Sequence, residues 1–218
     1  MEELKTPRVL DADEVETRVG KYVEGSGVSL LLYKTARVDM DILDETYGAG
    51  AWQDDYKEIK GVLYCGIAVN GVWKWDCGVE SNAEAQKEKG EASDAFKRAG
   101  FRWGIGRELY SAPFIWIPEE KFETKTVKGK KMPKDRFVVG NIQYSEKRKI
   151  SYLQIKNARS QEVVFSYGRA AAKYKCADCG HPIMDEYIAR GTLEAYGRHL
   201  CKACGLKAKR AKATRPET

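Results

Sequence analysis

The sequence predicts an α+β protein in which an antiparallel sheet packs on one long helix and a small cysteine-rich module follows. Three observations predict this class. A hairpin pattern occupies residues 61–80, and a stretch of good helix formers at 84–103 comes directly after it. Two Cys-x-x-Cys pairs stand near the C-terminus. We therefore expect a core domain at 1–168, a linker at 169–175 and a separate module at 176–218.

The composition is typical of a soluble globular protein, with 43% hydrophobic and 32% charged residues in a chain of 218. No apolar stretch approaches the ~18 residues that a membrane helix needs. The acidic start, "MEELKTPRVLDADEVE", lacks the apolar segment of a secretory signal. These features lead us to expect a cytoplasmic protein.

Charge is divided unevenly along the chain. Residues 1–118 carry 15 Lys and Arg against 21 Asp and Glu, whereas residues 119–218 carry 23 against 11. A basic half suggests a polyanionic partner, because electrostatics recognise phosphates without reading sequence. A solvated basic surface explains the same charge equally well.

The elements before the hairpin follow from apolar spacing. The pattern predicts a first helix over residues 11–23, an apolar segment at 28–34 and a second helix over 35–47 that Gly48 ends. Residues 52–59, "WQDDYKEI", form a plausible strand. With the hairpin they make three antiparallel strands followed by a helix.

The hairpin "GVLYCGIAV-NG-VWKWDCGVE" has a countable register. Asn70-Gly71 suits a type I′ turn, in which both central residues need positive φ. Val69 then faces Val72, and counting back places Tyr64 opposite Cys77. Alternation puts Cys65 and Cys77 on opposite faces of the sheet, so these cysteines should not form a disulfide.

The helix after the hairpin begins with a Ser81-x-x-Glu84 capping box. Its apolar face is narrow and made mostly of small residues, which lets it lie close on a sheet: Ala85, Ala92, Phe96, Ala99 and Trp103. Its C-terminal end crowds cations beside aromatic rings. For Phe96 and Trp103 the helical spacing favours core packing, whereas Trp73, Trp75 and Phe101 fit core packing and base stacking equally well.

The sequence predicts that the second half of the core domain forms strands on either side of a basic segment. Residues 111–118 are extended and buried, and residues 121–136 form a mobile basic loop. A second hairpin follows across "SEKR", from "RFVVGNIQY" to "KISYLQIKN", and "EVVFSY" adds a strand.

The two Cys-x-x-Cys pairs are separated by 21 residues, which matches a zinc ribbon or treble-clef knuckle. Each pair points two sulfurs at one centre, and four thiolates complete a tetrahedron with no open position. The expected cofactor is therefore a structural Zn²⁺ rather than a catalytic one. Disulfides are the competing reading, which a reducing cytoplasm disfavours. The expected ligands are Cys176, Cys179, Cys201 and Cys204.

No catalytic constellation stands out. The chain has no phosphate-binding P-loop, and its two histidines, His181 and His199, both lie in the cysteine module. Acidic clusters at 39–45 and 54–55 would suit a Mg²⁺-dependent nuclease, but solvated helix and strand surfaces explain them more simply. We therefore expect no catalytic residues and no enzyme activity.

Residues 33–106 resemble the annealing core of the Rad-fifty-two/Rad-twenty-two family and its phage relatives of the Sak type. The shared features come in the family's order: an arginine opening a helix that ends "DETYGAGAW", a three-stranded sheet ending "DCGVES", and the helix "AQKEKGEASDAFKRAGFRWG". The match covers about a third of the chain, and "SDAFKRA" is its most specific piece. The zinc module is not part of the family core.

The resemblance implies a β-β-β-α core that assembles into rings and hydrolyses no nucleotide. Single-stranded DNA would lie in a positive groove around the ring with its bases exposed for pairing. Carried over, the family's groove cations fall on Arg37, Lys97, Arg98 and Arg102, although Arg102 stands one position later than the family pattern has it. Further expected DNA contacts come from the basic loop: Lys128, Lys130 and Lys131.

We thus expect an ATP-independent protein of phage or prophage origin that binds and anneals single-stranded DNA for recombination and repair in a bacterial host cell. Its expected partners are single-stranded DNA, further copies of itself in a ring and a single-strand binding protein, with no membrane. Two alternatives stay open: a zinc-ribbon DNA-binding or adaptor protein, and a metal-dependent nuclease.

Overall fold

The structure is a computed structural model that describes residues 5–79, 87–171, 174–183 and 185–213. The chain divides into two compact units, residues 1–168 and 169–218, and each has a hydrophobic core of its own. Within the described ranges there are four α-helices, and every strand pairing is antiparallel. The mixed α+β class with antiparallel sheets is confirmed.

The first sheet of the larger unit has the strand order β1-β2-β6. Its strands are β1 (Glu16–Val23), β2 (Gly27–Tyr33) and β6 (Ile115–Pro118), and the 3-10 turns of this unit are η1 (Ala12–Glu14), η3 (Arg107–Ser111) and η4 (Glu119–Lys121). Buried side chains from β2 and β6, such as Val28 and Ile117, belong to the main core.

The helix predicted over residues 11–23 is wrong, because most of this segment is strand β1. Val19 is 46% exposed and Val23 is 38% exposed, so the valines whose spacing suggested a helix do not form a buried face. The Gly-Ser-Gly run after β1 lets the chain turn back into β2. Pairing with β2 then fixes β-branched and aromatic residues in an extended conformation, which they favour.

The second helix and the meander that follows are as the sequence predicts. Helix α1 (Ala36–Tyr47) ends at Gly48, whose φ is +97° and whose N–H donates to the Asp44 carbonyl at 2.8 Å. Strands β3 (Trp52–Ile59), β4 (Val62–Val69) and β5 (Val72–Cys77) form one antiparallel sheet in chain order.

The β4–β5 hairpin has the counted register, with Val69 opposite Val72 and Tyr64 opposite Cys77. Asn70 and Gly71 have φ of +49° and +78°, as a type I′ turn requires. Cys65 and Cys77 are both free. Asp76 and Lys74 stand on the same face of β5 as each other, because side chains alternate along a strand.

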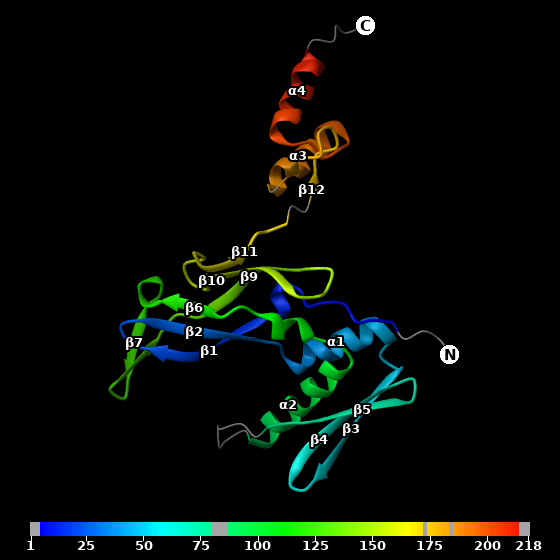
Figure 1. Cartoon of the computed structure of the whole chain (residues 1–218), viewed down its shortest axis with the longest axis vertical. Coiled ribbons are helices and arrows are strands. Elements are labelled where there is room, and N and C mark those ends of the chain that lie inside the picture. The colour runs from blue at the N-terminus through cyan, green and yellow to red at the C-terminus, as the bar shows by residue number, and fades with distance from the viewer. Residues whose placement is uncertain (1–4, 80–86, 172–173, 184, 214–218) are drawn as a thin grey trace. The chain divides into compact units, whose positions relative to one another are not determined.

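Helix α2 (Lys87–Arg102) packs against β4 and β5, and Figure 1 shows it lying along this sheet. Phe96 and Ala99 are buried, and the Trp103 indole N–H donates to the Ile67 carbonyl at 2.9 Å. Gly78 permits the close approach, because a Cβ there would lie 2.3 Å from the Glu91 carbonyl oxygen. The predicted capping box at Ser81 and Glu84 lies outside the described residues.

The basic segment predicted as a mobile loop over 121–136 instead contains a short β-hairpin. Its strands are β7 (Thr124–Val127) and β8 (Lys130–Pro133), and the turn between them is Lys128-Gly129 with φ of +50° and +75°. Cross-strand hydrogen bonds satisfy the backbone, so the charged side chains project from an ordered ribbon.

The remaining three-stranded sheet of the larger unit has the order β11-β10-β9, and it confirms the predicted second hairpin and added strand. Its strands are β9 (Phe137–Tyr144), β10 (Ile150–Asn157) and β11 (Val163–Gly168). The tight β9–β10 turn holds three cations, Lys147, Arg148 and Lys149, at one end of the sheet.

The smaller unit consists of a two-stranded ribbon and two helices. Its elements are β12 (Tyr174–Lys175), β13 (Pro182–Ile183), α3 (Glu186–Tyr196) and α4 (Lys202–Ala213). Part of the segment predicted as a linker is therefore strand β12, which pairs with β13. No helix in the described part of the chain is long and apolar enough to cross a membrane.

Candidate nucleic-acid interface and metal centre

Two of the predicted DNA-contacting cations share one carboxylate. The Arg98 Nε lies 3.7 Å from one Asp76 oxygen, and the Arg102 Nε donates to the other at 3.0 Å. Residues four apart lie on the same helix face, which here is turned toward β5. Both arginine side chains remain about half exposed, at 45% and 55%. An incoming phosphate can therefore reach both groups, in competition with Asp76.

The other two predicted cations lie apart from this pair. Lys97 is 3.8 Å from Asp94 on its own helix. Its positive charge also opposes the rise in the pKa of Asp39 of α1. Arg37 is exposed in the first turn of α1, and no ion pair joins it to another described residue. Of the four predicted cations, the structure brings Arg98 and Arg102 together at one carboxylate.

A buried ion pair joins Lys34, just before α1, to Asp39 of α1, and it packs against glycines at the end of α2. Burial raises the pKa of Asp39 to about 6, although the neighbouring Lys34 opposes that shift. Two glycines provide the room: a Cβ at Gly106 would lie 2.2 Å from the Lys34 Cε, and one at Gly100 would lie 2.8 Å from an Asp39 oxygen.

The acidic cluster at 39–45 has structural partners. Asp39 pairs with Lys34, Asp44 accepts from the Trp52 indole N–H at 2.6 Å, and Glu45 accepts from Arg8 at 2.7 Å. These contacts give three of the four carboxylates a structural partner, and Asp41 is exposed.

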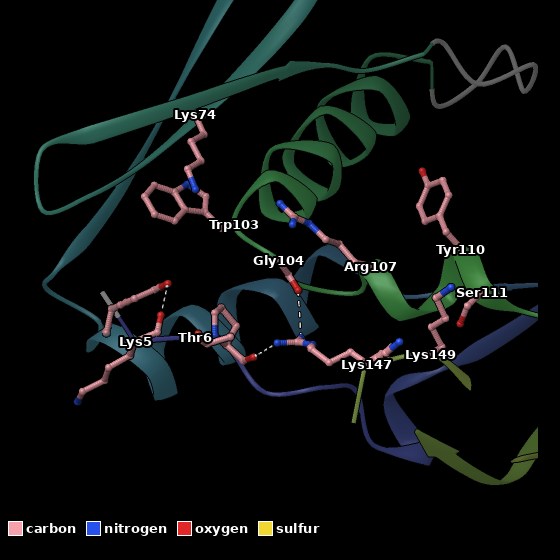
Figure 2. Close-up of a pocket in the computed structure, with 13 residues that line it drawn as sticks. Lys5, Thr6, Lys74, Trp103, Gly104, Arg107, Tyr110, Ser111, Lys147 and Lys149 are labelled. Carbon is pink, nitrogen blue, oxygen red and sulfur yellow. Dashed lines mark hydrogen bonds between the residues drawn. The ribbon is translucent and has the colours of Figure 1, made fainter. Parts of the chain in front are cut away.

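A basic groove of about 680 Å³ lies beside the C-terminal end of α2. Figure 2 shows side chains from separate parts of the chain arranged around one hollow. Among the described residues that line it there is no Asp or Glu. Its cations are Lys5, Lys74, Arg107, Lys147, Arg148 and Lys149, and its aromatic residues are Tyr47, Trp103 and Tyr110.

Two cations meet at the end of α2. The Lys74 Nζ lies 3.8 Å from the centre of the Trp103 ring and donates to the Arg102 carbonyl at 3.3 Å. Arg107 donates to the Phe101 and Arg102 carbonyls at 2.7 and 2.8 Å. Cations suit the negative end of a helix dipole. Burial and the nearby Arg107 charge lower the pKa of Lys74, as expected where positive groups crowd together.

Arg148 lines the groove and also holds the surrounding segments together. Its guanidinium donates to the Pro7, Arg8 and Gly104 carbonyls at 2.7, 3.1 and 3.2 Å. It thereby joins the N-terminal segment, the exit of α2 and the β9–β10 turn. Its turn neighbours Lys147 and Lys149 are exposed. They can contact a ligand without loss of a structural bond.

None of the predicted cations Arg37, Lys97, Arg98 and Arg102 lines the groove. The groove cations come from segments that the chain brings together only by folding, so sequence analysis missed them. Two local sequence features point to some of these groove cations. They are the basic turn "SEKRK" and a lysine on the hairpin strand between Trp73 and Trp75.

The three predicted contacts of the basic segment also lie outside the groove lining. Lys128 is exposed at the tip of the β7–β8 hairpin and Lys130 is exposed beside it. Lys131 forms an ion pair with Glu119, so its charge is already balanced inside the protein.

The four module cysteines gather at one point, with one Sγ atom from each residue and all within 4.8 Å of one another. The Cys179 and Cys201 sulfurs are 3.8 Å apart. Tetrahedral Zn–S bonds of about 2.3 Å place sulfurs about 3.8 Å apart, so this geometry fits such an ion. The cluster can therefore hold a metal ion.

The two pairs are positioned by different local structures. Gly180 has φ of +71° and its N–H donates to the Cys176 carbonyl at 2.9 Å, as a knuckle turn requires. Gly205, in contrast, lies inside α4, so the second pair sits at the start of a helix rather than in a second knuckle. A helix N-terminus favours thiolates, the form that binds metal.

Neighbouring groups set the cysteine pKa values apart. Backbone hydrogen bonds, chiefly at Cys201, lower the pKa of Cys176 to about 6. The thiol of Cys179 and its neighbours raise the pKa of Cys204 to about 12. Four thiolates this close together need a cation among them.

The Nδ1 atom of His199 lies 3.0 Å from the Ala189 carbonyl oxygen, so a hydrogen bond to the backbone occupies this ring nitrogen.

No protein-family model matches the sequence, and no curated protein matches it.

Proposed function

We propose that this protein binds single-stranded DNA along the basic groove and the adjoining end of α2, and anneals complementary strands without nucleotide hydrolysis. The observation that carries the proposal is the groove itself, in which the described lining offers six cations and no carboxylate. Such a surface attracts a chain of phosphates of any sequence and gains free energy by releasing their counterions.

The chain order of the larger unit gives independent support. Strands β3, β4 and β5 run directly into α2, the β-β-β-α order of the annealing family that the sequence resembles. The arginines on α2 and the groove cations both lie near the end of this helix. The groove cations Lys74 and Arg107 donate hydrogen bonds to the Arg102 carbonyl, so they lie next to the α2 arginines. A single DNA strand can thus run from Arg98 and Arg102 into the groove.

Annealing follows from such binding by a simple physical route. Cations hold the sugar–phosphate backbone and reduce the repulsion between two strands, while base edges stay available for pairing. As part of this proposal the protein forms a homo-oligomeric ring and acts on strands that a single-strand binding protein has covered. It contributes no catalytic residue, and the Cys176, Cys179, Cys201 and Cys204 centre holds a structural Zn²⁺.

Binding of a fluorescent oligonucleotide, followed by anisotropy, tests the groove. Lys147→Glu/Lys149→Glu reverses two exposed charges and should weaken binding by about tenfold or more, because each lost phosphate contact adds to the loss. Arg18→Glu/Lys21→Glu makes the same charge change on β1 and is the matched control. Equal losses in both variants would contradict the groove as the binding site.

The basic helix α4 favours a second candidate, in which the smaller unit makes the main DNA contact. Lys207 and Lys209 are both exposed on this helix, which has no acidic residue. Under this alternative Lys207→Glu/Lys209→Glu should abolish binding and the groove variant should bind normally. The proposed function predicts the reverse ranking of the two variants.

A further inference from the structure

Tyr110 is an unusually exposed aromatic ring at the side of the basic groove. It belongs to η3, lines the groove, and has 77% of its surface exposed. Figure 2 shows Tyr110 across the hollow from Lys74 and Trp103. Tyr110 therefore places an exposed ring beside a set of cations, which is the combination that binds single-stranded nucleic acid.

Tyr110 is supported from behind by a second ring. The centres of the Tyr110 and Phe101 rings are 4.6 Å apart, and the rings are tilted by 53°. Arg107 lies 5.6 Å from the Phe101 ring while its N–H groups bond the end of α2. These contacts hold Tyr110 in place and leave much of its ring free for another flat group.

We propose that Tyr110, backed by Phe101, is a base-stacking residue of the groove and makes it select single-stranded over duplex DNA. This inference rests on the proposed function. Each nucleotide offers a phosphate to the cations and a flat base to a ring, and every base has such a face. Bases in a duplex are already stacked on both faces, so only an open strand can place one against Tyr110.

Stacking is compatible with annealing because it uses the face of a base. The hydrogen-bonding edge stays free to meet a complementary strand. A stacked base also fixes the direction in which the neighbouring edges point. The nearby exposed cations Lys147 and Lys149 then hold the adjoining phosphates, so the two contacts alternate along one strand.

The test compares two strands of equal length and charge, an ordinary oligonucleotide and one whose sugars lack bases. Wild type should bind the ordinary strand roughly tenfold more tightly, within the range that base–aromatic stacking supports. Tyr110→Ala should bring this ratio close to one with little change in binding of the strand without bases. Tyr110→Phe should keep the ratio, since the ring and not the hydroxyl makes the contact.

Phe114→Ala is the matched control, because Phe114 is also 77% exposed and does not line the groove. It should keep the wild-type ratio. An unchanged ratio in Tyr110→Ala, with binding intact, overturns the inference and leaves the proposed function standing. Failure of wild type to bind either strand overturns the proposed function and this inference together.

A second readout uses 2-aminopurine placed in the ordinary strand, since stacking quenches its fluorescence. Wild type and Tyr110→Phe should quench it on binding, and Tyr110→Ala should quench it less. Equal quenching by wild type and Tyr110→Ala at saturation would overturn the inference even if the affinities differ.

Discussion

The cysteine centre and the basic groove gather their functional groups in different ways. The centre takes its sulfurs from two short motifs, Cys176-x-x-Cys179 and Cys201-x-x-Cys204, each shaped by its own turn or helix start. The groove takes cations from the N-terminal segment, β5, η3 and the β9–β10 turn. The first site is set by local geometry and can hold a metal ion, whereas the second depends on the packing of the whole larger unit.

This difference has consequences for stability. The smaller unit has a small core around Cys176, Ile183, Ala189 and Leu200, so little apolar burial supports it. The larger unit has an extensive core of its own. Removal of a metal ion from the cysteine centre should therefore unfold the smaller unit and leave the groove intact. Damage to the main core should disrupt the groove and leave the cysteine centre intact.

The largest expected effect is metal removal. Binding free energies for structural zinc are about 10–16 kcal/mol in small zinc modules, so a strong chelator or Cys176→Ser should unfold the smaller unit. Hydrogen exchange should show lost protection in α3 and unchanged protection in β4, β5 and α2. Simultaneous loss in both units would contradict their independence.

The next effect concerns the buried pair beside the end of α2. Asp39→Ala leaves the Lys34 ammonium buried without its carboxylate and should lower the free energy of unfolding by about 3–5 kcal/mol. Lys34→Met/Asp39→Leu removes both charges and should cost much less. Urea denaturation of the three proteins measures the difference, and an equal cost in both variants would contradict the role of the pair.

A smaller effect is expected in the salt dependence of DNA binding. Each phosphate contact with a single strand contributes about 0.7 to the slope of log K against log salt. Lys147→Ala/Lys149→Ala should therefore reduce that slope by about 1.4. Anisotropy titrations at several salt concentrations measure it, with Arg18→Ala/Lys21→Ala as the control. A slope equal to that of wild type would exclude both lysines as phosphate contacts.

The smallest expected effect is a gain in affinity for DNA rather than a loss. Asp76→Asn releases Arg98 and Arg102 from their shared carboxylate, and a surface ion pair is worth about 0.2–1 kcal/mol. Affinity for single-stranded DNA should rise about two- to fivefold. Asp55→Asn is the control, because Asp55 also pairs with a lysine, Lys57, at 3.5 Å. Unchanged or weaker binding by Asp76→Asn would show that the arginines do not contact DNA.

Local signals allowed much of the fold to be predicted. The Asn70-Gly71 turn determines a hairpin register within one segment, and Gly48 ends α1 because it can adopt positive φ. The cysteine cluster follows from spacing in the same way. In each case the residues that decide the structure are neighbours in the chain.

The failures have two causes. In two hairpins, pairing with the next strand overrides the local pattern, and in the groove, segments far apart in the chain come together only on folding. Val19 and Val23 have helical spacing, but pairing with β2 makes them part of a strand. The basic segment at 121–136 has few apolar residues, yet cross-strand hydrogen bonds fold part of it into a hairpin. The groove cations Lys74, Arg107 and Lys149 meet only after the larger unit folds, and no local pattern joins them.

The most direct measurement of the central claim is the annealing rate of two complementary labelled oligonucleotides, with no nucleotide and no Mg²⁺ present. We expect rapid annealing by wild type and by Arg18→Glu/Lys21→Glu, and strong loss in Lys147→Glu/Lys149→Glu with its fold intact by circular dichroism. Annealing by wild type no faster than in protein-free buffer, or equal rates in the two charge-reversed variants, would contradict it.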